Sequence, residues 1–120
     1  MQTKLIKIPL KPGSRAPVDK LISYMKSSPE LPFNEMNQKG YFWDSVFLDA
    51  QFNLYIVIKS PDFSSVMLNN DDLVETDFRA MYEKFRQQAW QSDVYEDIEA
   101  LACFNQALSF EQFDIMPEPA

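Results

Sequence analysis

Residues 41–60, YFWDSVFLDAQFNLYIVIKS, decide the fold because they hold two strand patterns one after the other. Tyr41–Asp49 and Phe52–Ser60 are rich in aromatic and β-branched residues, which favour strands, and residues of different character alternate along them. Only Ala50 and Gln51 separate the two runs. We therefore expect an antiparallel hairpin, although the Asn-Gly or Asp-Gly turn that favours short hairpins is missing.

The period of two also predicts which side chains of the hairpin share a face. In the first strand, one face carries Trp43, Ser45 and Phe47, and the other carries Phe42, Asp44, Val46 and Leu48. In the second strand, Leu54, Ile56 and Ile58 lie on one side, and Tyr55 and Val57 lie on the other. Large apolar side chains thus occupy both faces of the predicted hairpin.

A strand and a helix are predicted before the hairpin. Residues 3–10 alternate as a strand does, and Pro9 should lie where this strand leaves the sheet because it has no amide N–H to donate. Leu10–Gly13 (LKPG) then form a turn, in which Gly13 supplies a backbone conformation that other residues resist. Ser14 is expected to cap a helix with the apolar stripe Val18, Leu21, Ile22 and Met25.

Two prolines follow this helix. Pro29 and Pro32 should stop or reroute it, since each lacks an amide donor and restricts the residue before it. We expect a short helix to resume over Phe33–Lys39 and to end at Gly40.

The strongest helix pattern of the chain follows the hairpin. A short helix is predicted first, from Ser60 through Leu68. Thr76 or Asp77 then caps a longer helix with the continuous apolar stripe Phe78, Met81, Tyr82, Phe85 and Ala89. Residues 97–104, DIEALACF, suit a helix by composition, but we interpret them as a closing strand because of their place after the last helix.

Length and composition predict one domain, residues 1–104, and a tail, residues 105–120, that docks on the domain or exchanges onto a partner in a dimer. A chain of 120 residues is long enough to bury a core but short for two domains. Hydrophobic residues make up 46% and aromatic residues 14%, which excludes wholesale disorder. Ten Phe, five Tyr and two Trp exceed what one small core usually hides, so we expect a pocket or a subunit interface as well.

The charge balance excludes some partners. Eighteen Asp and Glu against eleven Lys and Arg give a net charge of -7. Nucleic acids and anionic membranes are therefore not expected as partners, because both are bound largely through Lys and Arg.

Cysteine usage and hydropathy bear on location. Cys103 is the only cysteine, so no intrachain disulfide can form and the chain suits a reducing compartment. The apolar run Leu5–Leu10 is interrupted by Lys7 and Pro9 and is too short for a signal peptide. No run approaches the ~20 apolar residues of a membrane-spanning helix. We therefore expect a cytoplasmic protein.

The order strand, LKPG turn, helix, hairpin, helix, strand resembles an uncharacterised family, known as a domain of unknown function, in the dimeric α/β-barrel superfamily. The likeness covers residues 3–104 and rests on Leu10–Gly13, on YFWDSVFLD and LYIVIK, and on TDFRAMYEKFRQQAW. It implies an α+β, ferredoxin-like βαββαβ fold with an antiparallel sheet, in which two subunits pair sheet to sheet as a homodimer. Relatives in this superfamily include cofactor-independent monooxygenases and haem-degrading enzymes.

Residue types that are missing exclude several chemistries. With no histidine and one cysteine, the chain cannot form a Ser-His-Asp or Cys-His catalytic site, a His-containing zinc site or a His-ligated haem site. In this it departs from the haem-binding relatives. Its two glycines, Gly13 and Gly40, lie too far apart for a phosphate-binding loop or a dinucleotide fingerprint. We expect no cofactor.

An acidic cluster precedes the last helix: Asp71, Asp72, Glu75 and Asp77, beside Asn69 and Asn70. Oxygen-rich loops of this kind can hold calcium, but the glycine and the spacing of an EF-hand are absent. We favour carboxylates that stabilise a helix N-terminus through its dipole, and we expect no metal site.

The candidate site lies on the hairpin. Trp43, Phe47 and Tyr55 could line a cavity between sheet and helices, or the dimer face of the sheet, and Arg79 is the obvious cationic partner. Asp44 is a weak catalytic candidate, because a carboxylate among aromatic side chains can have its pKa raised enough to transfer protons. The alternative is that the aromatic residues form core or interface and that Asp44 pairs with an arginine or a backbone amide.

Three functions remain open. The leading hypothesis is a homodimeric domain with a small-molecule pocket between sheet and helices, without an assigned reaction. The second is a cofactor-independent monooxygenase or isomerase that acts on a planar organic compound through Trp43, Asp44 and Tyr55. The third is a non-catalytic module that binds a protein partner.

Overall fold

The computed structural model describes residues 2–65 and 76–104, which form an α+β fold. The elements follow in the order β1 (Gln2–Pro9), α1 (Arg15–Ser27), α2 (Glu30–Gln38), β2 (Phe42–Leu48), β3 (Asn53–Ser60), the 3-10 turn η1 (Phe63–Ser65), α3 (Asp77–Ala89) and β4 (Glu96–Ile98). The strands form one four-stranded sheet in the order β2-β3-β1-β4, and every neighbouring pair is antiparallel. The predicted antiparallel α+β architecture is thus confirmed.

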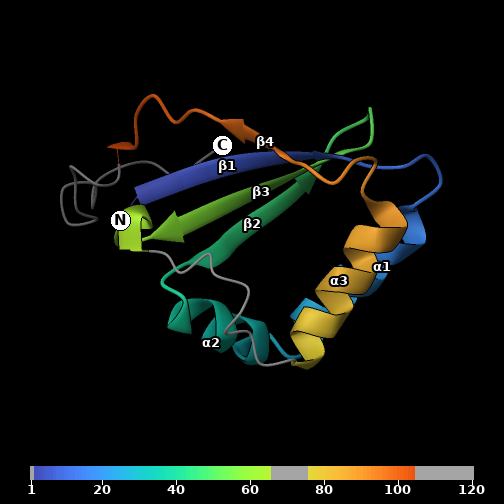
Figure 1. Cartoon of the computed structure of the whole chain (residues 1–120), viewed down its shortest axis with the longest axis horizontal. Helices are drawn as coiled ribbons and strands as arrows, with labels where there is room; N and C mark the ends of the chain where they lie inside the picture. Colours follow the sequence, from blue (N-terminus) through green and yellow to red (C-terminus); the bar gives the residue numbers. More distant parts are fainter. Residues whose placement is uncertain (1, 66–75, 105–120) are drawn as a thin grey trace, which may run out of the picture.

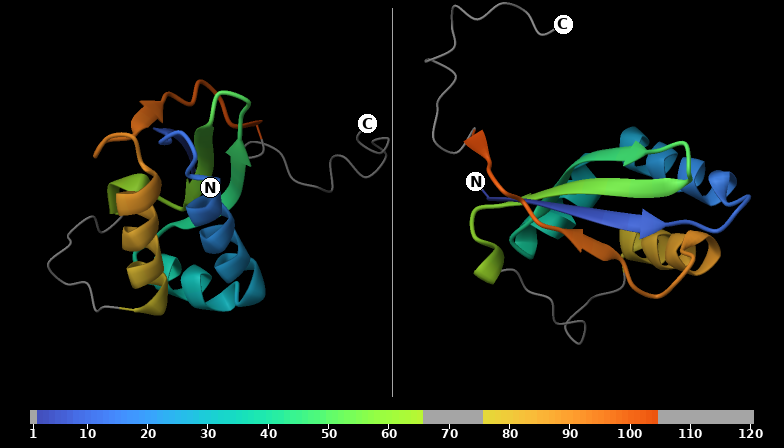
Figure 2. Two further views of the ribbon diagram at one scale, coloured as in Figure 1. Left: turned by 90° about the vertical axis from the view of Figure 1, so that its right-hand side faces the viewer. Right: turned by 90° about the horizontal axis from the view of Figure 1, so that it is seen from above.

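The described helices lie on one face of the sheet, and no helix within residues 2–65 and 76–104 covers its other face, which we call the open face (Figures 1 and 2). Helices α1 and α3 pack against each other, while α2 packs against β2. The core lies between the two layers and includes Ile6, Ile8, Leu54 and Ile56 of the sheet and Val18, Leu21, Met36 and Phe85 of the helices. Apolar burial on this one face is the main stabilisation of the fold.

The turn after β1 forms as the LKPG sequence predicts. Gly13 has a φ of +78°, in the left-handed region that favours glycine. Ser14 takes the predicted position before α1, but its hydroxyl donates to the carbonyl of Lys11 at 2.7 Å instead of accepting an amide of the helix. An isolated β-bridge between Leu10 and Trp90, the residue after α3, also stabilises the turn.

The second helix begins earlier than predicted. It covers Glu30–Gln38 and includes Pro32, which is buried in its first turn. A proline is tolerated there because the first amides of a helix have no partner within the helix. Of the two prolines, Pro29 thus stands at the junction of α1 and α2, whereas Pro32 does not interrupt α2.

A β-bulge at Asp44 corrects the predicted faces of the first hairpin strand. Trp43 pairs with Ile58 and Ser45 pairs with Val57, so Asp44 has no partner on β3. One extra residue reverses the alternation of side chains beyond it. Trp43 therefore shares the helix-covered face with Val46 and Leu48 rather than the opposite face with Ser45 and Phe47.

The hairpin turn replaces the missing Asn-Gly chemistry with an aspartate. The carboxylate of Asp49 accepts hydrogen bonds from the amides of Gln51 and Asn53, at 3.0 and 2.8 Å. It also accepts the hydroxyl of Tyr55 at 2.9 Å. Phe52 has a φ of +65°, which a non-glycine residue adopts rarely. The side chain of Asp49 thus organises a turn that the backbone alone favours weakly.

The remaining elements are partly as predicted. Thr76 caps α3 as expected. Residues 97–104 are a strand only at their start, since β4 pairs with β1 through Glu96–Ile98 and residues 99–103 form no strand. The predicted helix at 60–68 is a 3-10 turn over Phe63–Ser65 in its described part, and the tail 105–120 lies outside the described residues. No helix among the described residues has the length and apolar character needed to cross a membrane.

Candidate functional site

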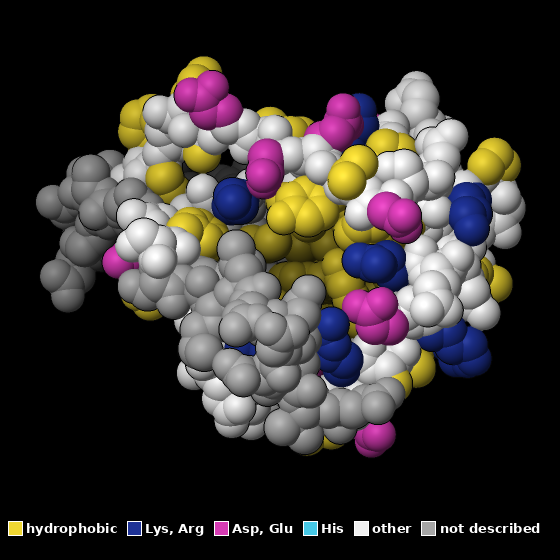
Figure 3. All heavy atoms as spheres, viewed as in Figure 1, with side chains coloured by type: hydrophobic (Ala, Val, Ile, Leu, Met, Phe, Trp, Pro, Cys, Tyr) yellow, Lys and Arg dark blue, Asp and Glu magenta, His cyan; other side chains and the backbone are white. Residues whose placement is uncertain are grey.

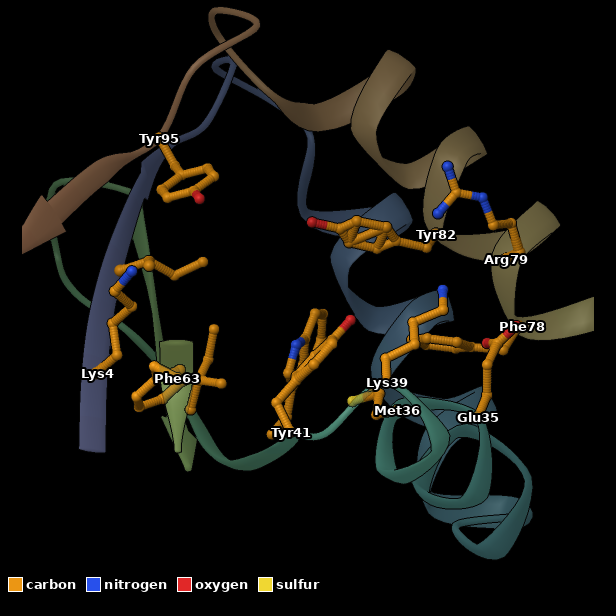
Figure 4. Close-up of a pocket in the computed structure, with 13 residues that line it drawn as sticks. Lys4, Glu35, Met36, Lys39, Tyr41, Phe63, Phe78, Arg79, Tyr82 and Tyr95 are labelled. Atoms are coloured by element: carbon orange, nitrogen blue, oxygen red, sulfur yellow. The ribbon is translucent and has the colours of Figure 1, made fainter. Parts of the chain in front are cut away.

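A pocket of about 230 Å³ opens between the sheet and helices α2 and α3. Its floor comes from the helix-covered face of the sheet, through Ile6, Trp43 and Ile58. Its walls come from α2 and the segment after it, from η1, from α3, and from Tyr95 beside β4. Figure 3 shows the apolar hollow with basic and acidic side chains around it, and Figure 4 shows its lining side chains.

Aromatic rings form a connected wall of the pocket. The ring of Trp43 meets those of Phe78 and Tyr82 edge to face, with centroids 6.1 and 5.6 Å apart. Behind the lining, Tyr82 also meets the buried ring of Trp90, which in turn meets Tyr95 with centroids 6.3 Å apart. Edge-to-face contacts of this kind fix ring orientation, so the wall is largely formed before any ligand binds.

Charged side chains meet the same pocket. Lys4, Lys39 and Arg79 supply positive charge and Glu35 supplies negative charge. Lys4 also contacts Asp97 at 3.6 Å, and Arg79 contacts Glu83 at 3.5 Å. Within residues 2–65 and 76–104, Lys39 makes no ion pair. The lining of the pocket therefore has more positive than negative groups, in a chain of net charge -7.

The carboxylate of Glu35 is held in place from α3. It accepts a hydrogen bond from the hydroxyl of Thr76, and this hydroxyl accepts the amide of Arg79 at 3.0 Å. The cap of α3 thereby joins two walls of the pocket, with Glu35 on α2 and Arg79 on the first turn of α3.

Burial shifts the protonation of several lining groups. Burial lowers the pKa of Lys39. The negative charge of Glu35 partly opposes this shift, and the positive charge of Arg79 adds to it. Burial also raises the pKa values of Tyr41 and Tyr82, that of Tyr82 very strongly. The tyrosine hydroxyls therefore stay protonated near neutral pH and can donate hydrogen bonds to a ligand.

A second hollow of about 390 Å³ lies between α2 and β2. It shares Met36 and Trp43 with the first pocket, but its other lining residues are apolar except for Glu30. Binding sites usually combine apolar walls with a few polar groups that orient the ligand. The pocket beside α3 has such groups, so we take it as the candidate site.

The structure brings two of the predicted site residues together and separates the other three. Trp43 and Arg79 both line the pocket. Asp44 lies outside it, exposed on the edge strand, with the ammonium of Lys59 at 3.6 Å. Phe47 and Tyr55 pair across β2 and β3 on the open face of the sheet. The expectation that Trp43, Asp44 and Tyr55 converge on one site is thus wrong: the bulge turns Trp43 away from the face that holds Tyr55, and Asp44, the residue after Trp43, has no partner on β3.

Several lining residues were not found from the sequence: Lys4, Glu35, Lys39, Tyr41 and Tyr95. They come from separate elements and share no motif, so no spacing along the chain predicts them. The one usable signal was the stripe of the last helix, which contains Phe78 and Tyr82.

No group of three or more potential metal ligands occurs among the described residues. Asp77 lies in the first turn of α3, where the helix dipole favours a carboxylate. Asp71, Asp72 and Glu75 of the predicted acidic cluster lie outside the described residues.

Comparison of the chain with models of known protein families, with curated proteins and with solved structures finds no match. The functional argument therefore depends on the geometry of the pocket and of the open sheet face.

Proposed function

We propose that this chain is a ferredoxin-like domain that binds a small organic molecule in the pocket beside α3 and forms a homodimer through the open face of its sheet. The observation that carries the proposal is the pocket of about 230 Å³, with its connected aromatic wall and its few charged groups. Cavities of about 150 Å³ already admit benzene, so the space fits a compound of one or two rings.

The arrangement of the sheet supports the ferredoxin-like part of the proposal. Its order β2-β3-β1-β4 places the first strand between β3 and the last strand, with every pair antiparallel. The hairpin lies between α1 and α3 in the chain, as in a βαββαβ unit, and α2 is an addition before the hairpin.

The open face of the sheet supports the dimer. Leu5 pairs with Val57 and with Ile98, and the neighbouring rung pairs Tyr55 with Phe47. These side chains are half-buried or exposed, and Phe47 is 57% exposed. This face also carries Lys7 and Glu96, which form an ion pair between β1 and β4. A sheet face with large exposed apolar side chains is nevertheless typical of an interaction surface, and the family resemblance implies sheet-to-sheet pairing for such a face.

The dimer is tested by light scattering or sedimentation at micromolar concentrations. We expect the mass of two chains. A stable particle with the mass of one chain would refute the dimer while leaving the pocket untouched.

Ligand binding is tested with a neutral aromatic probe, 1-naphthalenemethanol, by saturation-transfer NMR. We expect transfer to the probe in the wild type and its loss in Ile58→Trp, which fills the floor of the pocket. Ser23→Trp adds the same side chain at an exposed position of α1 and should bind as the wild type does. Equal binding by both variants, or none by the wild type, would refute the site.

The oxygenase or isomerase hypothesis is not carried further, because its three residues do not meet. Trp43 lines the pocket, Asp44 pairs with Lys59 outside it, and Tyr55 lies on the opposite face of the sheet. The interaction-module hypothesis assigns the binding of a protein partner to the acidic surface and the tail, and the tail lies outside the described residues.

A further inference from the structure

We propose that the pocket selects a planar organic anion, such as an aromatic carboxylate, whose charged group binds Lys39 and Arg79 while its ring lies against Trp43 and Tyr82. This inference rests on the proposed small-molecule site and names the chemistry of its ligand. It depends on the positions of the charges, the partners that they already have, and the shape of the aromatic wall.

The charges are placed asymmetrically in the pocket. Lys39 follows α2 and Arg79 belongs to α3, and both lie on the helix side, near Tyr82 (Figure 4). Lys4 and Phe63 lie on the other side of the pocket. The ammonium of Lys4 lies over the ring of Phe63, 5.7 Å from the ring centroid. A ligand that spans the pocket thus meets cations mainly at its helix end and aromatic surface over the rest.

The carboxylate of Glu35 offsets only part of the positive charge of Lys39 and Arg79 at this helix end. Glu35 accepts the hydroxyl of Thr76 and has no ion pair among the described residues. Arg79 has its ion pair with Glu83 on the same helix, and Lys39 has none in the described part of the chain. A bound carboxylate would therefore add a partner for Lys39 without displacing one.

Electrostatics within the site favour the same ligand. Glu35 attracts Lys39 and Arg79 repels it less strongly, while burial removes part of the water that would screen these charges. An anion between the two cations would relieve this repulsion. Two neutral tyrosine hydroxyls, those of Tyr41 and Tyr82, are also in the lining and can donate to its oxygens.

One negative charge fits better than several. The lining has three cations, Lys4, Lys39 and Arg79, against one carboxylate, Glu35, and two of the cations already have acidic neighbours. The exterior of the chain is acidic overall, so anions do not gather on it non-specifically. Anion binding measured on this protein would thus report on the pocket.

The test compares three naphthalene probes of nearly equal size by isothermal titration calorimetry: 1-naphthoate, 1-naphthalenemethanol and 1-naphthylmethylammonium. We expect the anion to bind about 10-fold more tightly than the alcohol, since a charge-assisted hydrogen bond increases affinity by at least this factor. The ammonium should bind most weakly. Added salt should weaken the binding of the anion and leave the alcohol unchanged.

Two variants locate the preference. Lys39→Gln and Arg79→Gln should each remove most of the anion's advantage, measured as the ratio of the affinities for the anion and for the alcohol in the same variant. Lys20→Gln, at an exposed position of α1, is the matched control and should keep the preference. Circular dichroism checks that each variant is folded, and saturable binding of the alcohol checks that each variant still forms the pocket.

The outcomes separate the inference from the proposed function. If the alcohol binds as tightly as the anion, or if Lys20→Gln and Lys39→Gln behave alike, the anion preference is refuted and the small-molecule site stands. If none of the probes binds the wild type, both are refuted.

Discussion

The hydroxyl of Thr76 donates a hydrogen bond to the carboxylate of Glu35, which ties the start of α3 to α2 across one end of the pocket. The same oxygen accepts the amide of Arg79, so one side chain both caps a helix and fixes a charged group of the site. The stability of α3 and the geometry of the pocket are therefore coupled through this residue.

Thr76→Val should destabilise the protein by about 1 kcal/mol, the usual effect of losing an N-cap side chain. Thr76→Ser keeps the hydroxyl and should retain most of the stability. Urea unfolding followed by circular dichroism measures both. If the valine and serine variants unfold together, the hydroxyl contributes nothing to the cap.

Asp49→Asn should weaken the hairpin at neutral pH and much less in acid. Hydrogen bonds, chiefly from the amide of Asn53 and also from the hydroxyl of Tyr55, hold the pKa of Asp49 below its usual 3.8. A carboxyl group with a lowered folded-state pKa stabilises the fold fully above the unfolded value, and this stability is lost as pH falls through the folded pKa. The difference in urea midpoint between wild type and variant should therefore shrink below about pH 4.

Tyr55→Phe is the control for this pair, since it removes one hydrogen bond of Asp49 and leaves the backbone contacts. Its loss of stability at neutral pH should be smaller than that of Asp49→Asn. The role given to the carboxylate would be contradicted if the wild type and Asp49→Asn differed in urea midpoint by the same amount at pH 7 and at pH 3.

Phe47→Glu should weaken the proposed dimer by at least ~10-fold, because it places a charge in an apolar interface without a partner. Phe47 is 57% exposed in the single chain, so the change should leave the fold of the monomer intact. Sedimentation over a range of concentrations measures the shift. Lys20→Glu makes a new acid on the helix side and should not change association.

Gly13→Ala should destabilise the protein by about 1 kcal/mol through the backbone alone. The φ of Gly13 is +78°, and an added Cβ would meet nothing within 4 Å. Asn tolerates this conformation better than Ala, so Gly13→Asn should unfold at a higher urea concentration than Gly13→Ala. The reverse order would show that the turn changes its conformation in the variants.

The affinity for 1-naphthoate should fall as pH rises and Lys39 loses its proton. The fall should begin at a lower pH than the deprotonation of an ordinary lysine would cause. Burial lowers the pKa of Lys39 from its usual 10.5, so Lys39 loses its charge at a lower pH than an ordinary lysine does. Burial raises the pKa of Tyr41, so the ionisation of this hydroxyl does not account for the fall. Calorimetry between pH 7 and pH 10 measures the profile.

Lys39→Arg provides the control, because a guanidinium does not deprotonate in this range. It should keep binding 1-naphthoate at the high end of the pH range. Identical profiles for the wild type and Lys39→Arg would assign the pH dependence to another group.

Much of the fold was predictable because its signals are local. The strand patterns around Ala50 and Gln51 gave the hairpin, and the stripe from Phe78 to Ala89 gave α3. Boundaries were less certain where two residue properties compete, as at Pro32, which can interrupt a helix or begin one. The site was predicted only at Trp43 and Arg79, because the other lining residues share no spacing.

The sequence by itself determined the α+β class, the hairpin, the turn at Gly13 and the absence of histidine chemistry, since each depends on residue types or on periodicity within one segment. Only the tertiary structure decided which face Trp43 occupies, because one unpaired residue in β2 reverses the alternation and no local pattern marks it. Only the tertiary structure, too, placed Lys39 and Arg79 in one pocket, because their elements meet through packing over the sheet. The charge pattern of the candidate site is thus a property of the packed helices rather than of any segment.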